Sequence, residues 1–90
     1  AEALELGFLN RVVPQADVLP TALDLAERIA ANGPIAVQAI RRSARACLGR
    51  PEAEAMQIES ERAGPVFPTE DAREGPIAFM QKRKPVFHGR

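Results

Sequence analysis

The sequence predicts a mainly α-helical protein, and three observations support this prediction. Apolar residues recur three and four positions apart along most of the 90 residues, which is the spacing of a helix face. Gly and Pro divide this pattern into short segments, as they do between consecutive helices. Much of the 46% hydrophobic content is Ala, and the four aromatic residues are all Phe. We therefore expect short helices around a thin core.

The first fourteen residues are expected to form a short helix and a strand. Residues 1–6 are helix-prone, and Gly7 is placed as the C-terminal stop. Residues 8–13 form a β-branched and aromatic run that Pro14 closes, so the sequence predicts a short strand there. A lone strand needs a partner for its backbone groups. This unpaired strand and the start at Ala1 rather than Met favour a piece of a longer chain.

Residues 15–90 are expected to form four helices. Asp17 is a candidate N-cap for the first of them. Gly33 and Pro34 then separate two helices, because Gly suits the position after a C-terminus and Pro suits the first helical position. Gly49 and Gly64 mark the next two breaks. The expected ranges are about 17–31, 34–48, 51–63 and 70–84.

Charge is concentrated at the two ends of the last predicted helix. Thr69 is its candidate N-cap, and Glu70 and Asp71 complement the helix dipole in the first turn. Residues 82–84 are basic and lie at the other end. Pro76 is expected to kink the helix, because it has no N–H for the carbonyl four residues earlier.

Phe79 and Lys82 are the candidate binding residues of this helix. Their three-residue separation predicts that they share one helical face. An aromatic plane beside an ammonium group could hold a base and a phosphate. The alternative is core packing for Phe79 and solvation for Lys82, and the residues alone leave both open.

Charge and cysteine content argue against several classes of function. Twelve basic and twelve acidic residues give a net charge of zero, so neither nucleic acid nor an anionic membrane is an expected partner. Cys47 is the single cysteine, which predicts no disulfide framework, no metal site and a reducing, cytoplasmic location. No apolar run approaches the ~20 residues that span a bilayer.

Three residues with reactive side chains are assigned structural roles. His88 has no second imidazole or thiol near it in the sequence, and we expect a solvent-facing tail residue. Cys47 lies on an apolar helical stripe, which favours a small buried side chain over a nucleophile. Glu59 is interpreted as a salt-bridged structural carboxylate, because acid–base catalysis would require burial.

The chain contains, in this order, the segments A-E-A-L-E-L-G-F-L-N-R-V-V-P, A-E-R-I-A-A-N-G-P-I-A-V-Q-A-I-R-R and T-E-D-A-R-E-G-P-I-A-F-M-Q-K-R-K-P-V-F-H-G-R. Their order and spacing resemble those of the enoyl-CoA hydratase/isomerase (crotonase) superfamily. The resemblance implies the helical C-terminal trimerisation region of the crotonase fold, which follows a spiral core. Residues 1–14 would then be the end of the linkage to that core, and residues 15–90 the helical region.

The resemblance also implies a function in fatty acid metabolism. The parent enzyme would hydrate a 2-trans-enoyl-CoA as a trimer or hexamer, with no prosthetic group and with coenzyme A as part of its acyl-CoA substrate. An aromatic residue and a lysine near the CoA adenine and 3′-phosphate fall on Phe79 and Lys82, often across a subunit boundary. The family's catalytic groups precede this segment, so we assign no catalytic residue here and expect the 90 residues alone to be inactive.

Two other functions are compatible with the sequence. The chain could be a stand-alone helical module for oligomerisation or interaction. It could also belong to a family member with other thioester chemistry, such as double-bond isomerisation.

Overall fold

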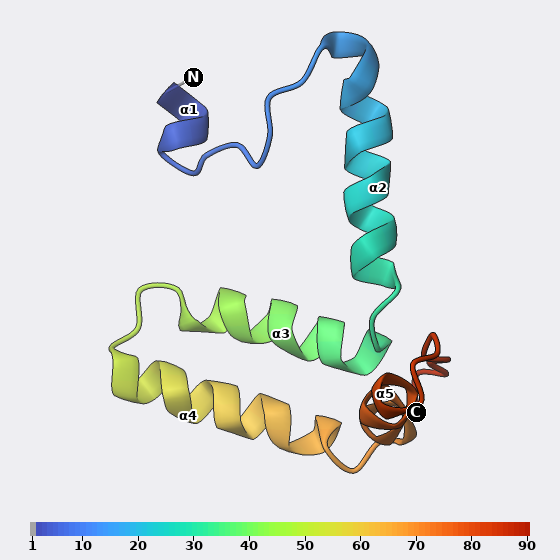
Figure 1. Ribbon diagram of the computed structural model, residues 1–90. Coiled ribbons are helices and arrows are strands. Elements are labelled where there is room, and N and C mark those ends of the chain that lie inside the picture. Colours follow the sequence, from blue (N-terminus) through green and yellow to red (C-terminus); the bar gives the residue numbers. More distant parts are fainter. Residues whose placement is uncertain (1) are drawn as a thin grey trace.

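The computed structural model describes residues 2–90, and the chain is mainly helical (Figure 1). The predicted helical class is therefore confirmed. In chain order the elements are α1 (Glu2–Glu5), the 3₁₀ turn η1 (Gln15–Asp17), α2 (Val18–Ala30), α3 (Pro34–Cys47), α4 (Glu52–Ala63), the 3₁₀ turn η2 (Gly64–Val66) and α5 (Glu70–Met80).

The predicted strand at residues 8–13 is wrong. These residues run as irregular chain between α1 and η1, and no strand occurs among the described residues. Their composition favours extended backbone, but a strand is stable only when a neighbouring strand takes up its N–H and C=O groups. Nothing in the described chain supplies that neighbour. The apolar side chains here are left open, with Phe8 86% exposed.

Helices α3 and α4 form an antiparallel hairpin, which is the most extensive helix–helix contact of the described chain (Figure 1). Pro34 occupies the first turn of α3, where its missing N–H costs nothing. Gly49 allows the turn between the helices by adopting a φ of 70°. The half-buried Cys47 joins the pair, because its Sγ lies 3.4 Å from the Ala55 carbonyl oxygen as a weak donor.

Helix α2 leads away from this hairpin (Figure 1). Its apolar face carries Leu19 and Leu23, and both side chains are exposed. No helix of residues 2–90 is long and apolar enough to cross a bilayer. Residues 9–13 lie beside the first half of α2, where Thr21 and Leu25 are half-buried, and the rest of its apolar face is open.

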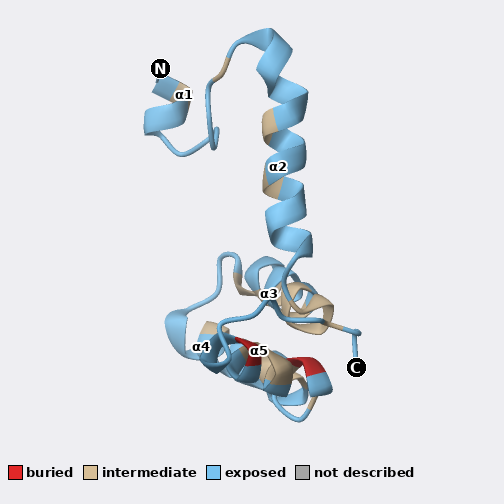
Figure 2. Ribbon diagram, turned by 45° about the vertical axis from the view of Figure 1, so that its right-hand side comes forward, coloured by how far each residue is buried: buried red, intermediate tan, exposed pale blue. Residues whose placement is uncertain are grey.

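The helices do not close around a core of their own. The radius of gyration is 16.6 Å, whereas a compact domain of 90 residues has about 12 Å. The accessible surface is 7636 Å², whereas a compact 9.8 kDa protein exposes about 5,200 Å². Among residues 2–90 only Asp71 and Ala78 are buried, and both belong to α5 (Figure 2).

Candidate functional site

The start of α5 is fixed by its N-cap. Thr69 Oγ1 accepts a hydrogen bond from the Ala72 backbone N–H at 3.1 Å and donates one to the Val66 carbonyl at 2.7 Å. These two bonds join the first turn of the helix to the end of η2. The structure confirms the capping role predicted for Thr69. The helix then continues through Pro76 to its end at Met80.

The end of α5 differs from the sequence prediction. The helix stops at Met80 rather than at residue 84, because Lys82 adopts a φ of 53°. Lys82 N–H donates to the Phe79 carbonyl at 3.1 Å, and Arg83 N–H donates to the Ala78 carbonyl at 3.0 Å. This pair of bonds is a Schellman motif with a lysine in the left-handed position. Such backbone costs a residue other than Gly roughly 1–2 kcal/mol.

Phe79 and Lys82 therefore do not share a helical face, and that part of the prediction is wrong. Phe79 lies in the last turn of α5, whereas Lys82 lies in the turn beyond it. Phe79 is 86% exposed, which excludes core packing against the described chain. Lys82 is exposed as well. An aromatic ring and an ammonium group thus stand beside one helix end, open to a ligand or to another subunit.

Glu74 holds the turn that carries Lys82. Its carboxylate pairs with both Nη atoms of Arg83, with Nη2 at 2.8 Å from Oε2, and accepts the Val86 N–H at 2.8 Å. The Arg83 hydrogen bond first, and the Val86 N–H second, lower the pKa of Glu74 to about 2. The same bond raises the pKa of Arg83. Glu74 and Arg83 are nine positions apart, so helical spacing gives no signal for this pair.

The other reactive residues of the sequence do not form a site. His88 is exposed. Its backbone N–H, rather than its imidazole, donates a hydrogen bond to Asp71 Oδ1 at 2.7 Å. Glu59 is exposed on α4, and the salt bridges of residues 2–90 do not include it. The predicted ion pair of Glu59 is therefore absent from the described chain. No group of His, Cys, Asp and Glu in this part of the chain could hold a metal ion.

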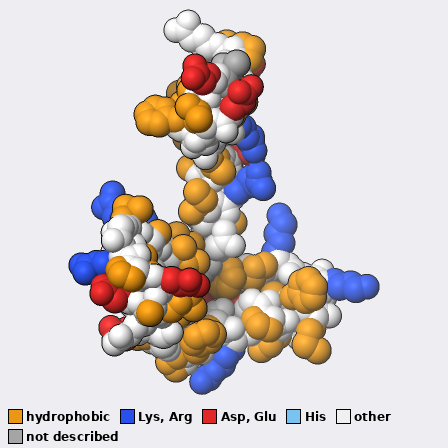
Figure 3. Space-filling view, turned by 90° about the vertical axis from the view of Figure 1, so that its left-hand side faces the viewer, with side chains coloured by type: hydrophobic (Ala, Val, Ile, Leu, Met, Phe, Trp, Pro, Cys, Tyr) orange, Lys and Arg blue, Asp and Glu red, His pale blue; other side chains and the backbone are white. Residues whose placement is uncertain are grey.

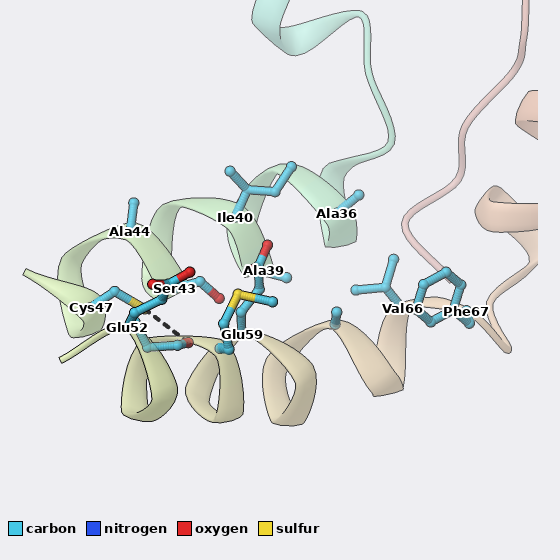
Figure 4. A pocket seen from close by; sticks show the side chains of 13 residues that line it. Ala36, Ala39, Ile40, Ser43, Ala44, Cys47, Glu52, Glu59, Val66 and Phe67 are labelled. Atoms are coloured by element: carbon cyan, nitrogen blue, oxygen red, sulfur yellow. Dashed lines mark hydrogen bonds between the residues drawn. The ribbon is translucent and has the colours of Figure 1, made fainter. Parts of the chain in front are cut away.

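An open apolar cavity of about 430 Å³ lies along the α3–α4 hairpin (Figure 4). Its polar side chains are Ser43, Glu52 and Glu59, and no histidine or lysine of residues 2–90 lines it. The cavity therefore suits a hydrophobic segment better than proton transfer. The remaining lining residues are Ala36, Ala39, Ile40, Ala44, Cys47, Ala55, Met56, Ala63, Val66 and Phe67.

A family model described as enoyl-CoA hydratase/isomerase matches residues 1–90. The chain belongs to the enoyl-CoA hydratase/isomerase family. It is 50% identical over 90 residues to enoyl-CoA hydratase EchA19 of Mycobacterium tuberculosis, covering 100% of this chain and 34% of that protein. It is 38% identical over 93 residues to carnitinyl-CoA dehydratase of Escherichia coli, covering 99% of this chain and 36% of that protein.

Solved structures of the enoyl-CoA hydratase/isomerase family contain the same arrangement of helices. A putative enoyl-CoA hydratase/isomerase from Mycobacterium abscessus matches with a TM-score of 0.93 at 39% identity, covering 99% of this chain and 37% of that one. An enoyl-CoA hydratase from Bacillus anthracis matches with a TM-score of 0.93 at 35% identity, covering 99% and 34%. The chain spans about a third of the length of these relatives. Its open arrangement is therefore one that occurs within larger chains.

Proposed function

We propose that this chain is the helical region of an enzyme that adds water across the double bond of 2-trans-enoyl-CoA thioesters. Family membership and the 50% identity to a protein named enoyl-CoA hydratase support this reaction. Coenzyme A would enter as part of the substrate, and no prosthetic group is required. We also predict a role in fatty acid metabolism. The single Cys47 predicts a cytoplasmic location.

The observation that carries the role of this segment is its excess of open surface. The 7636 Å² of accessible surface exceeds that of a compact protein of this size by about 2,400 Å². One partner of a standard interface contributes only about 800 Å². Apolar side chains lie open among the charged ones over this surface (Figure 3). The segment is suited to pack against the rest of its own chain and against further subunits of a trimer or hexamer.

Phe79 and Lys82 are the proposed contacts to coenzyme A. An exposed ring can stack on an adenine, and an ammonium group can pair with a phosphate. Both side chains are open to a ligand at one end of α5. The exposure of Phe79 also suits a contact that a neighbouring subunit completes.

The chemistry of hydration is not expected from these residues. The reaction requires donors that stabilise an oxyanion and a positioned acid or base. Asp71 is the only buried acid of residues 2–90, and its two oxygens are occupied by the backbone N–H groups of His88 and Gly89. Glu74 is occupied by Arg83 and Val86. The segment is therefore proposed to cover substrate rather than to catalyse.

A hydration assay on crotonyl-CoA tests this proposal. The protein as the cell makes it should consume the conjugated double bond, whereas the isolated 90 residues should show no turnover. Appreciable turnover by the isolated chain would contradict the assignment of chemistry elsewhere. Lys82→Met should raise KM roughly tenfold with little change in kcat, since an ion pair to phosphate contributes on the order of 1.5–3 kcal/mol. Lys84→Met is the matched control, because it removes a nearby positive charge outside the proposed contact.

A stand-alone interaction module is the competing function, favoured by the exposed side chains of Leu19 and Leu23 on α2. The sedimentation behaviour of the isolated chain distinguishes this module from the helical region of a larger enzyme. A discrete, well-folded oligomer would support the module, and a loose or aggregating chain would support the proposed role. Other thioester chemistry, such as double-bond isomerisation, is separated by replacing crotonyl-CoA with a 3-enoyl-CoA in the same assay.

A further inference from the structure

The C-terminal tail, residues 83–90, runs back along α5 from its C-terminal end to its N-terminal end. Arg83 and Val86 meet Glu74 in the middle of the helix. His88 and Gly89 meet Asp71 in its first turn. The contacts therefore follow the tail in order, in the direction opposite to the helix.

Asp71 holds the end of this tail in two ways. Its carboxylate accepts the N–H of His88 at 2.7 Å and that of Gly89 at 2.8 Å. Its own N–H, which has no partner inside the first turn of a helix, donates to the Arg90 carbonyl at 3.1 Å. Asp71 is only 6% exposed, although no cation pairs with it among residues 2–90. The buried carboxylate is thus compensated by the tail backbone and by the helix dipole.

The other side of the tail packs against the junction of α2 and α3. A Cβ at Gly33 would lie 3.7 Å from the ring of Phe87 and 3.7 Å from Asp71 Cβ. A Cβ at Gly89 would lie 3.4 Å from Pro34 Cγ. Phe87 is half-buried, whereas the other three Phe side chains are exposed. The tail therefore lies between α5 and the α2–α3 junction and joins them.

We propose that Asp71 and Glu74 are positioning residues, which strap residues 83–90 along α5 and thereby hold Lys82 where its ammonium group meets the coenzyme A phosphate. The positioning of Lys82 rests on the proposed function, whereas the attachment of residues 83–90 to α5 does not. We call residues 83–90, bound to Asp71 and Glu74, the strap. The strap accounts for the left-handed backbone of Lys82, because Glu74 binds Arg83 and Val86, which follow Lys82 in the chain. It also supplies a connection for α5, which has no extensive contact with another helix of the described chain.

Amide hydrogen exchange of the protein as the cell makes it tests the strap. Asp71→Asn should raise exchange at His88 and Gly89 roughly tenfold, because an amide cannot accept both N–H groups as a carboxylate does. Glu74→Gln should raise exchange at Val86 several-fold. The Ala55 amide, which donates to the Pro51 carbonyl at the start of α4, lies away from the tail and should stay unchanged in both.

Glu70→Gln is the matched control on the same turn of α5. Glu70 pairs with Arg90 at 2.9 Å, but the two side chains are 63% and 71% exposed, so this pair contributes little. Unchanged exchange at residues 86–89, or an equal rise at Ala55, would overturn the strap. If Asp71→Asn fails to fold, the milder Glu74→Gln decides the test.

The positioning of Lys82 is tested by comparing coenzyme A with its 3′-dephospho form. The parent protein should bind coenzyme A more tightly, and Glu74→Gln should lose that preference while its affinity for the dephospho form stays the same. A variant that loosens the tail and keeps the preference would overturn the positioning role. A parent protein without any preference would contradict the Lys82 contact itself, and the exchange result would still decide the strap.

Discussion

The carbonyl oxygen of Phe79 accepts the backbone N–H of Lys82 at 3.1 Å, and Lys82 adopts a φ of 53°. This bond closes the end of α5, so the two candidate contacts to a ligand lie on either side of a helix terminus. The position after a C-cap is usually Gly, because left-handed backbone is unfavourable for other residues. A lysine in such strained backbone points to a requirement for its side chain.

Replacing Lys82 with Gly and with Ala separates the backbone of this position from its side chain. Lys82→Gly relieves the left-handed strain, whereas Lys82→Ala keeps it. After the larger unfolded-state entropy of Gly is taken into account, the Gly variant should be about 0.5–1 kcal/mol more stable than the Ala variant. Urea unfolding measures this difference. Both variants should lose coenzyme A affinity equally, and equal stability of the two would contradict the strain.

The cap of α5 should contribute measurably to stability. Thr69→Ala removes the acceptor for the Ala72 N–H and the donor to the Val66 carbonyl. The expected loss in the free energy of unfolding is about 1 kcal/mol. Thr69→Ser keeps the hydroxyl and should remain within about 0.5 kcal/mol of the parent. A Ser variant as unstable as the Ala variant would assign the effect to the methyl group instead.

Features set by neighbouring residues could be predicted from the sequence. The Thr69 cap and the break at Gly33 and Pro34 depend on side chains within a few positions of one another, and the structure shows both. The strap could not be predicted in this way. It joins Asp71 to Gly89, 18 positions later, and a buried carboxylate reads in the sequence as an ordinary first-turn acid.

Two of the wrong predictions, the strand and the end of the last helix, have separate physical causes. Residues 8–13 have the composition of a strand, but strand formation depends on a second segment that local composition does not reveal. The sequence predicts a helix that reaches residue 84, because residues 81–84 lack Gly and Pro. What ends α5 instead is the left-handed backbone of Lys82, beyond which Glu74 binds Arg83 and Val86. In the first case the described chain supplies no partner strand, and in the second Glu74 binds residues beyond the turn.

The carboxylate of Glu74 should titrate near pH 2. Its pKa is lowered from the ordinary 4.5 to about 2, first by the Arg83 hydrogen bond and then by the Val86 N–H, with His88 adding a smaller attraction. A lowered pKa in the folded state stabilises the fold above pH 4.5, and this contribution is lost as the pH falls toward 2.

A carbon-detected NMR titration of the Glu74 carboxyl measures its pKa. Arg83→Gln should return the midpoint toward 4.5, because it removes the largest cause of the shift. Arg90→Gln is the control, since Arg90 pairs with Glu70 and not with Glu74. A parent midpoint near 4.5 would show that the Glu74–Arg83 pair does not form.

Ala78 should tolerate no larger side chain. It is 1% exposed and is the one buried apolar residue among residues 2–90. Ala78→Leu should lower the free energy of unfolding by about 1–3 kcal/mol, because added methyl groups have no space without displacing neighbours. Ala53→Leu on the exposed face of α4 is the control, since Ala and Leu have similar helix propensities.

The Ala78 variant also tests how the packing of α5 is coupled to its proposed ligand contacts. Ala78 adjoins Phe79 in the chain, and its carbonyl accepts the Arg83 N–H that closes the turn around Lys82. A side chain that displaces this part of the helix should therefore move both contacts. Ala78→Leu is expected to weaken coenzyme A binding as well as stability, whereas Ala53→Leu should change neither. Full affinity in a destabilised Ala78→Leu protein would show that the ligand contacts do not depend on this packing.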